Sequence, residues 1–288
     1  MSVNIQTIKE IRPFLEKELS AIYPSTEIGA FTNIIIKTVF KTSKLHIHAF
    51  PESLLTPKQA HQIKSICREL KEGKPLQYVL GETSFYNCTI KVNKDTLIPR
   101  PETEELVDLI IRENRGFRGS VLDAGTGSGC IAVALAINLP GTRVIGFDIS
   151  EGAISLAREN ALLNNASIEF FTADIMNLEN KSIGNTDIIV SNPPYVRESE
   201  KKLMAGNVLN YEPHSALFVP DSEPLKYYKY IMKLAKVILV RGGRVYFEIN
   251  EAMGAEMKDL LSEQGFSDIV VNRDLNGRER MIKGIRNE

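Results

Sequence analysis

From residue 101 onward, short apolar runs alternate with longer amphipathic segments. The short runs predict strands at Ser120–Ala124, Arg143–Phe147, Ile168–Thr172, Asp187–Ser191, Arg244–Ile249, Asp268–Asn272 and Arg280–Ile285. The segments between most of them predict helices at Glu102–Glu113, Cys130–Asn138, Glu151–Asn164, Pro224–Leu239 and Ala252–Gln264. Because helices between parallel strands must cover both faces of the sheet, this order predicts a doubly wound α/β fold.

The last two predicted strands are joined by a short link, Arg273–Glu279. A parallel crossover needs roughly a dozen residues or more, so these strands must form an antiparallel hairpin. A Rossmann-like sheet of seven strands that ends in an antiparallel strand resembles the class I fold of S-adenosylmethionine-dependent methyltransferases. We therefore expect residues 100–288 to form such a domain.

Residues 1–74 have helical periodicity instead. Pro13 interrupts the first apolar run and should kink or start a helix there. Thr56 and Gln59 have the spacing of a capping box, with Pro57 at the first helical position, and they predict a helix that runs to about Glu72. Thr42 and Ser43 offer a cap for a shorter segment. We expect a small N-terminal helical bundle over residues 1–83 that docks a substrate, and a β-hairpin linker over 84–99.

Charge and cysteine content restrict the classes of protein. There are 35 Lys and Arg against 36 Asp and Glu, a net charge of −1 that argues against direct nucleic-acid binding. Cys67, Cys88 and Cys130 form no C-x-x-C pair, which favours buried free thiols. His46 and His48 have no further ligands beside them, so no metal site is predicted.

Targeting signals are not evident in the sequence. No stretch has the roughly 18 uncharged apolar residues of a membrane span, and the opening MSVNIQTIKE lacks the apolar run of a signal peptide. We expect a cytoplasmic protein without membrane association.

The turn after the first strand of this α/β domain is rich in glycine. Gly125, Thr126, Gly127, Ser128 and Gly129 follow a strand and precede a helix, so the backbone can approach a ligand closely. The spacing is G-x-G-x-G, and Cys130 stands where the dinucleotide fingerprint G-x-G-x-x-G needs its third glycine. A nicotinamide or flavin site is therefore the weaker alternative, and the loop is similar to the one that holds the methionine part of S-adenosylmethionine.

Acidic residues follow the next two strands. Asp148 ends the second strand, at the spacing from the glycines where a carboxylate binds ribose hydroxyls. Asp174 follows the third strand, and the methyltransferase resemblance places it opposite the adenine amino group with Ile175 beside the ring. The alternative for any single acid is a helix N-cap.

The fourth strand ends in Asn192-Pro193-Pro194-Tyr195, which resembles the motif of methyltransferases that modify planar nitrogens. An amide nitrogen is a poor nucleophile, and two acceptors that hold its N–H bonds can aim it at a methyl group. The Asn192 side-chain oxygen and the Pro193 carbonyl are such acceptors, and Tyr195 can pack on the flat amide. The alternative is a turn that only ends the strand.

Further motifs resemble the HemK/PrmC family of protein-(glutamine-N5) methyltransferases: residues 75–78 (PLQY) with Gly81, and residues 97–104 (LIPRPETE). This resemblance covers nearly the whole chain. It implies methyl transfer from S-adenosyl-L-methionine, with S-adenosyl-L-homocysteine as product, to the glutamine of the Gly-Gly-Gln motif in class I peptide chain release factors. The chain departs from the family pattern at Asn87, Asn250 and Ser222.

Three other functions stay open. Methylation of a glutamine in a ribosomal protein would use the same chemistry. Adenine-N6 methylation of nucleic acid would need a basic groove, which the net charge does not favour. A non-catalytic S-adenosylmethionine-binding partner protein would not need Asn192.

Overall fold

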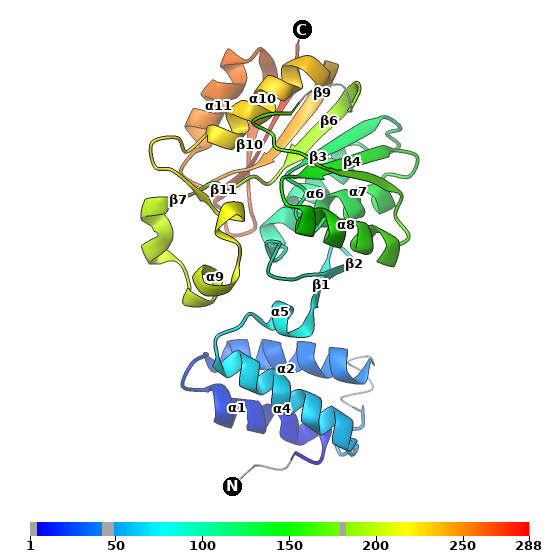
Figure 1. The fold of residues 1–288 in the computed structure, drawn as a ribbon, viewed down its shortest axis with the longest axis vertical. Coiled ribbons are helices and arrows are strands. Elements are labelled where there is room, and N and C mark those ends of the chain that lie inside the picture. The colour runs from blue at the N-terminus through cyan, green and yellow to red at the C-terminus, as the bar shows by residue number, and fades with distance from the viewer. Residues whose placement is uncertain (1–4, 42–48, 179–182, 288) are drawn as a thin grey trace. The chain divides into compact units, whose positions relative to one another are not determined.

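The computed structural model describes residues 5–41, 49–178 and 183–287, which divide into two compact units. One unit comprises the N-terminal part of the chain up to Gly81 together with Gly206–Tyr211. The other holds the remainder (Figure 1). Thr42, Ser43, His46 and His48 lie outside the described residues.

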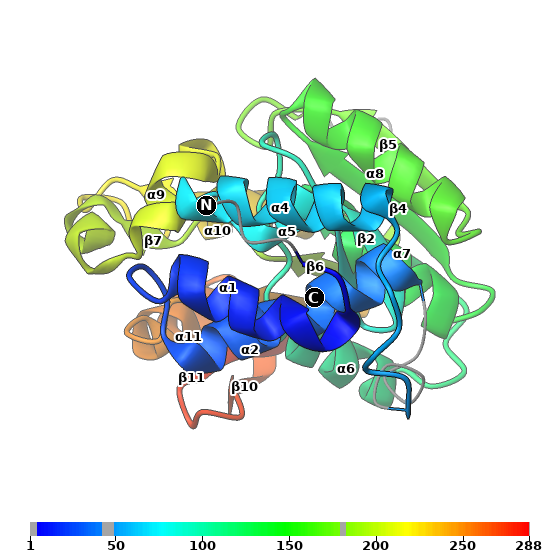
Figure 2. The ribbon, with the colours of Figure 1, turned by 90° about the horizontal axis from the view of Figure 1, so that it is seen from below.

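The helical unit is built around three helices, α1, α2 and α4, which pack against one another (Figure 1, Figure 2). Its elements are η1 (Ile8–Glu10), α1 (Ile11–Leu19), α2 (Ser25–Phe40), α4 (Pro57–Lys71), α5 (Leu76–Leu80) and α9 (Gly206–Tyr211). The capping box at Thr56 and Gln59 is present as predicted. Pro13 occupies the first turn of α1, where its missing N–H has no intrahelical partner to lose. Tyr211 donates a hydrogen bond to the Glu72 carbonyl at 2.8 Å and ties α9 to the end of α4.

The second unit contains the α/β fold predicted from the alternation. Its strands are β1 (Glu82–Phe85), β2 (Cys88–Lys91), β3 (Ser120–Ala124), β4 (Arg143–Asp148), β5 (Ile168–Thr172), β6 (Thr186–Ser191), β7 (Val196–Arg197), β8 (Phe218–Val219), β9 (Leu239–Glu248), β10 (Phe266–Arg273) and β11 (Glu279–Arg286). Its helices are α6 (Pro101–Glu113), α7 (Cys130–Asn138), α8 (Glu151–Leu163), η3 (Glu198–Leu203), η4 (His214–Ala216), α10 (Lys226–Ile238) and α11 (Gly254–Glu263).

Seven of these strands form one sheet in the order β10-β11-β9-β6-β3-β4-β5. The pairs β3–β4, β3–β6, β4–β5 and β6–β9 are parallel, whereas β11 runs antiparallel to both neighbours. The predicted terminal hairpin is therefore confirmed. Because β3 and β6 are central neighbours, the turns that follow them meet at the same edge of the sheet.

One strand is longer than the sequence indicates. We expected a helix to Leu239 and a strand from Arg244, but β9 begins at Leu239. Gly242 has a φ of 75°, and the register between β6 and β9 shifts between residues 186 and 188. The residues between Leu239 and Arg244, which resemble a loop in sequence, therefore form a bulge within the strand.

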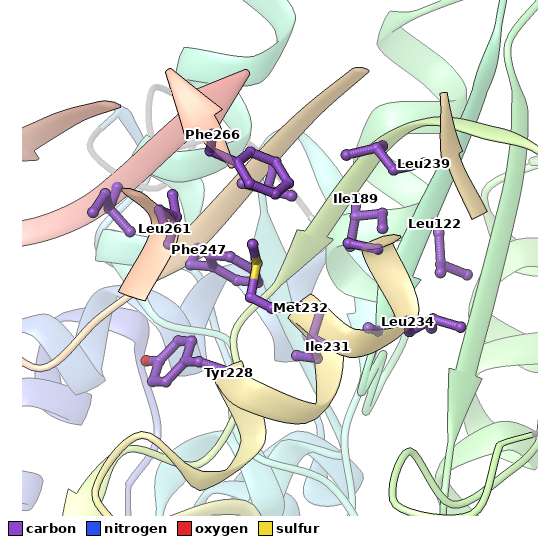
Figure 3. Packing of buried hydrophobic residues seen from close by; sticks show 14 of the residues in the cluster. Leu122, Ile189, Tyr228, Ile231, Met232, Leu234, Leu239, Phe247, Leu261 and Phe266 are labelled. Atoms are coloured by element: carbon purple, nitrogen blue, oxygen red, sulfur yellow. The ribbon is translucent and has the colours of Figure 1, made fainter. Parts of the chain in front are cut away.

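Alternation along the strands divides the core between two faces. Leu122, Ile189 and Phe247 point toward α10 and α11, where Tyr228 and Met232 pack among them (Figure 3). Tyr246 and Glu248 therefore point to the opposite face of β9, which α6 covers. Side chains on the α6 face, such as Glu248, can therefore approach the turns at the strand ends from beneath α6.

A hairpin was predicted over residues 84–99, and the structure has one that begins two residues earlier and ends sooner, with Glu82–Phe85 paired to Cys88–Lys91. Its turn is formed by Tyr86 and Asn87 at φ of 44° and 64°. Asn87 thus adopts the left-handed conformation, which asparagine tolerates better than most residues other than glycine.

The three cysteines are buried and free. Within the described ranges no helix has both the length and the apolar composition to cross a membrane.

Candidate active site

The loop between β3 and α7 presents its backbone to a cavity. Gly125 and Gly127 have φ of 72° and 54°, and a Cβ added at either would meet no atom within 4 Å. The backbone N–H groups of Gly125 and Thr126 both donate to the Phe147 carbonyl at 2.9 Å, which fixes the loop to the end of β4. The loop is therefore held in place while two of its residues leave open space beside the backbone.

The cavity runs along the carboxyl ends of β3, β4, β5 and β6. Of the twelve residues that the sequence assigns to the site, ten line it: Gly125, Thr126, Gly127, Ser128, Asp148, Asp174, Ile175, Asn192, Pro193 and Pro194. Within the described chain, Gly129 and Tyr195 are not part of this lining. A Cβ at Gly129 would approach Ala157 Cβ to 3.0 Å, so this glycine permits α7 to start close to α8.

Asp148 is held by two backbone donors. Its Oδ2 accepts from the Gly127 N–H and its Oδ1 from the Ser150 N–H, both at 2.9 Å. Burial raises the pKa of Asp148, and the backbone bonds counteract part of that rise. Each oxygen keeps a lone pair that can accept from a ligand hydroxyl.

The turn after β6 is fixed through its two polar side chains. Asn192 donates from Nδ2 to Thr103 Oγ1 at 3.1 Å, and the Tyr195 hydroxyl donates to Glu248 Oε1 at 2.9 Å. Burial and the neighbouring Glu248 charge raise the pKa of Tyr195 well above its usual value. A raised pKa keeps the Tyr195 hydroxyl protonated, in agreement with its role as the donor to Glu248.

Curated relatives match nearly the whole chain. A release factor glutamine methyltransferase of Flavobacterium psychrophilum is 43% identical over 280 residues, which is 96% of this chain and 98% of the relative. One of Bacteroides thetaiotaomicron is 39% identical over 97% of this chain and 100% of its own length. The chain belongs to this methyltransferase family. Residues 103–217 match the Methyltransferase small domain and residues 14–81 the PrmC N-terminal domain.

Solved structures agree with the fold. The delta-N METTL16 methyltransferase domain superimposes with a TM-score of 0.52 at 19% identity, over 70% of this chain and 90% of that one. This likeness concerns the fold alone, because the sequence identity is low. It is consistent with the class I methyltransferase sheet.

Sequence reasoning missed part of the cavity wall of this methyltransferase. The additional lining includes residues 95–97, 99–100 and 215–216, together with Thr103, Ala124, Cys130, Ile131, Phe147, Ile149, Ser150, Ala173, Met176, Ser191, Tyr227 and Ile231. Only the segment 99–104 carried a signal, since it precedes the first strand of the sheet. Glu212 anchors that segment: it accepts from the Ile98 N–H at 3.1 Å and from Arg100 at 2.6 Å.

A buried acid lies just behind the glycine loop. Asp123 is fully buried, and burial raises its pKa to about 7. Thr126 donates to its Oδ2 at 2.6 Å, while Oδ1 has no hydrogen-bond partner. The methyltransferase thus carries a titratable group that supports the loop from inside the protein.

Two departures from the family pattern affect positions outside the cavity wall. Asn250 accepts from the Ala252 N–H at 3.0 Å and donates to Glu200 at 3.1 Å, which links the end of β9 to η3. Ser222 lies in an exposed turn. Among the described residues no group of three or more potential metal ligands occurs.

Proposed function

We propose that this methyltransferase transfers a methyl group from S-adenosyl-L-methionine to N5 of the glutamine in the Gly-Gly-Gln motif of class I peptide chain release factors. The observation that carries the proposal is the common cavity. The Asn192-Pro193-Pro194 turn lines the same cavity as the glycine loop and Asp148. Cofactor and acceptor can therefore meet at one edge of the sheet.

The chemistry of the cavity lining supports the proposed cofactor. Gly125 and Gly127 leave room for a group that lies against the backbone. Asp148 offers carboxylate oxygens for ribose hydroxyls, and Ile175 an apolar surface for a flat ring. S-adenosyl-L-methionine would supply an electrophilic methyl group at this place.

Asn192 and Pro193 provide the chemistry that a glutamine amide needs. Its nitrogen is a weak nucleophile because the lone pair is delocalised into the carbonyl. The Asn192 Oδ1 and the Pro193 carbonyl would accept its two N–H bonds and aim the nitrogen. Positive charge develops on this nitrogen during transfer, so both acceptors bind more strongly in the transition state than in the ground state.

The choice of protein substrate rests on the relatives, which are named for release factors. We propose that the helical unit docks this partner. Deleting the unit would be a poor test, because α9 packs with it through Tyr211 and Glu72. The double substitution Lys58→Glu and Arg68→Glu on the exposed side of α4 should instead raise KM for the release factor and leave the cofactor Kd unchanged.

The decisive experiment is transfer of labelled methyl groups, followed by mass mapping of the product. The substrates are a class I release factor, its Gly-Gly-Gln→Gly-Gly-Ala variant, a ribosomal protein and duplex DNA. Label on the wild-type factor alone supports the proposal. Label on the ribosomal protein or on DNA, with none on the factor, would assign the site to another planar nitrogen.

The Asn192→Ala variant tests the assigned chemistry. It should retain cofactor affinity and lose most of the transfer rate, because only the reacting amide contacts the lost oxygen. An equal loss of cofactor binding would contradict this role.

A further inference from the structure

A chain of polar side chains runs from the turn after β6 into the space beneath α6. Asn192 donates to Thr103 Oγ1 at 3.1 Å, and Thr103 in turn donates to Glu248 Oε2 at 2.6 Å. The other oxygen of Glu248 accepts from the Tyr195 hydroxyl at 2.9 Å. Thr103 and Glu248 are buried, with exposed fractions of 2% and 1%. The side chain of Asn192 thus contacts a buried threonine that is itself hydrogen-bonded to a buried carboxylate.

The sheet explains how Glu248 comes to lie there. Phe247 packs with Tyr228 and Met232 on the α10 side of the sheet (Figure 3). The next residue must point to the opposite face, beneath α6. Thr103 stands in the first turn of α6, on the buried stripe of that helix. One side chain from a helix and one from a strand, 145 positions apart in sequence, therefore meet directly behind Asn192.

The carboxylate of Glu248 determines which group donates and which accepts at each link of this hydrogen-bond chain. An ionised carboxylate can only accept, so the single hydroxyl proton of Thr103 is committed to Glu248. The Thr103 oxygen can then only accept from its other neighbour. The amide of Asn192 must therefore turn its NH₂ group toward Thr103 and its Oδ1 away from it. Reversing the amide would bring two acceptor oxygens face to face.

We propose that Glu248 and Thr103 are positioning residues that fix the amide orientation of Asn192, so that an acceptor rather than a donor meets the substrate amide. This inference rests on the proposed function, in which Asn192 Oδ1 accepts an N–H bond from glutamine. A reversed Asn192 would present NH₂ to NH₂ and could not hold the acceptor. The same carboxylate fixes Tyr195, so one buried group orients both polar side chains of the motif.

A buried carboxylate at this position destabilises the folded protein, so its presence suggests that the charge is needed for function. Burial of an ionised acid is unfavourable, and apolar packing is often a stable replacement for buried charge. Burial also raises the pKa of Glu248. The titratable and charged groups that face it are Arg280 from β11, Glu102 from α6, Cys130 from α7, and the hydroxyls of Tyr195 and Tyr228.

Substitutions at Thr103 test the chain at its middle. Thr103→Val removes the hydroxyl at nearly constant size, whereas Thr103→Ser keeps it. At saturating cofactor and release factor, we expect Thr103→Val to slow single-turnover methyl transfer at least tenfold and Thr103→Ser less than threefold. The cofactor Kd should change less than twofold in both. Tyr228→Phe is the matched control, because it removes a buried hydroxyl that donates to the Glu248 backbone carbonyl and not to this chain.

Glu248→Gln tests the direction of the chain. A glutamine can donate to Thr103 and so permits the reversed arrangement. We expect at least a tenfold slower transfer. In the wild type, protonation of Glu248 permits the same reversal, so the rate should fall as pH drops through its pKa. That acid limb should be absent from Glu248→Gln and present in Tyr228→Phe.

A spectroscopic readout makes the inference independent of activity. In protein labelled with ¹⁵N-asparagine, the Asn192 side-chain signals are those lost in Asn192→Ala. They should shift in Thr103→Val and stay near their wild-type positions in Thr103→Ser. If they do not move, or if Thr103→Val transfers methyl groups as fast as wild type while Asn192→Ala is inactive, the positioning role is wrong. If the wild type does not methylate the release factor, the proposed function fails, and the spectrum alone decides the orientation of Asn192.

Discussion

Gly129 allows a prediction that separates packing from ligand binding. Its φ is 78°, and a Cβ added there would lie 3.0 Å from Ala157 Cβ and 3.2 Å from Ala157 Cα. Gly129→Ala therefore carries two penalties. A left-handed alanine costs about 1–2 kcal/mol, and overpacking of a rigid contact costs about 1–3 kcal/mol. We expect a loss of about 2–5 kcal/mol in the free energy of unfolding.

Gly116 provides the matched control. Its φ is 75° and an added Cβ meets nothing within 4 Å, so Gly116→Ala carries only the backbone penalty of about 1–2 kcal/mol. Both glycines belong to the same unit. The difference between the two variants, about 1–3 kcal/mol, thus isolates the close approach of α7 to α8. Urea unfolding followed by circular dichroism measures it.

Cofactor titration completes the test, with Gly125→Ala as a third variant. An added Cβ at Gly125 strains the backbone and enters the open space beside the loop, so it should match Gly116→Ala in stability but weaken cofactor binding. If Gly129→Ala and Gly116→Ala differ by less than about 0.5 kcal/mol, the packing argument is refuted. If Gly129→Ala stays fully stable and loses the cofactor, Gly129 belongs to the binding surface after all.

Three further predictions concern other parts of the chain. Asp148→Ala should weaken cofactor binding by about 1.5–3 kcal/mol, the scale of charged hydrogen bonds, and an unchanged Kd would remove this acid from the site. Thr56→Ala should cost about 1 kcal/mol through loss of the cap on α4, seen as faster hydrogen exchange of the Gln59 amide. Burial raises the pKa of Asp123 from 3.8 to about 7, so its contribution to stability declines as pH rises across that window. Asp123→Asn cannot ionise, and its unfolding free energy relative to wild type should rise by about 3–4 kcal/mol between pH 4 and 7. Parallel pH curves would contradict this.

Much of the fold follows from local sequence. The limits of β3, β5 and α7 agree with the predicted ranges to the residue, because each is a short segment with apolar residues between clear turn signals. The predicted start of β9 was wrong, because Gly242 and Gly243 have the composition of a loop. In the structure they lie in a bulge between Leu239 and Arg244, the two positions at which β9 pairs with the start of β6. The grouping of α9 with the helical unit also leaves no local trace, since it depends on a contact across 139 positions.

The candidate site likewise contains residues that local sequence predicts and residues that depend on tertiary contacts. Asp148, Asp174 and Asn192 stand at strand ends, and parallel strands bring their carboxyl ends to one edge, so sequence alone could group them. Pro99 and Arg100 could be expected at the site because their segment precedes the first strand of the sheet. The wall formed by residues 95–97 has no such signal, and a tertiary contact of Glu212 with Ile98 and Arg100 holds this part of the chain in place. Thr103 belongs to the segment 99–104 that the sequence marks, but its contact with Asn192 was not predicted, because a threonine in the first turn of a helix has no pattern that names its partner.

A signal for the buried network was nevertheless present in β9. The run Val245-Tyr246-Phe247-Glu248 belongs to a strand with neighbours on both sides, and such strands are apolar on both faces. Tyr246 and Glu248 alternate with Val245 and Phe247, so both polar groups fall on one face and each requires a buried partner. The structure supplies both from α6 and its C-cap: Asn114 donates to the Tyr246 hydroxyl at 3.2 Å, and Thr103 donates to Glu248. The position of a polar residue in a central strand therefore predicts which covering helix supplies its buried partner. Here that partner is Thr103, which also contacts Asn192.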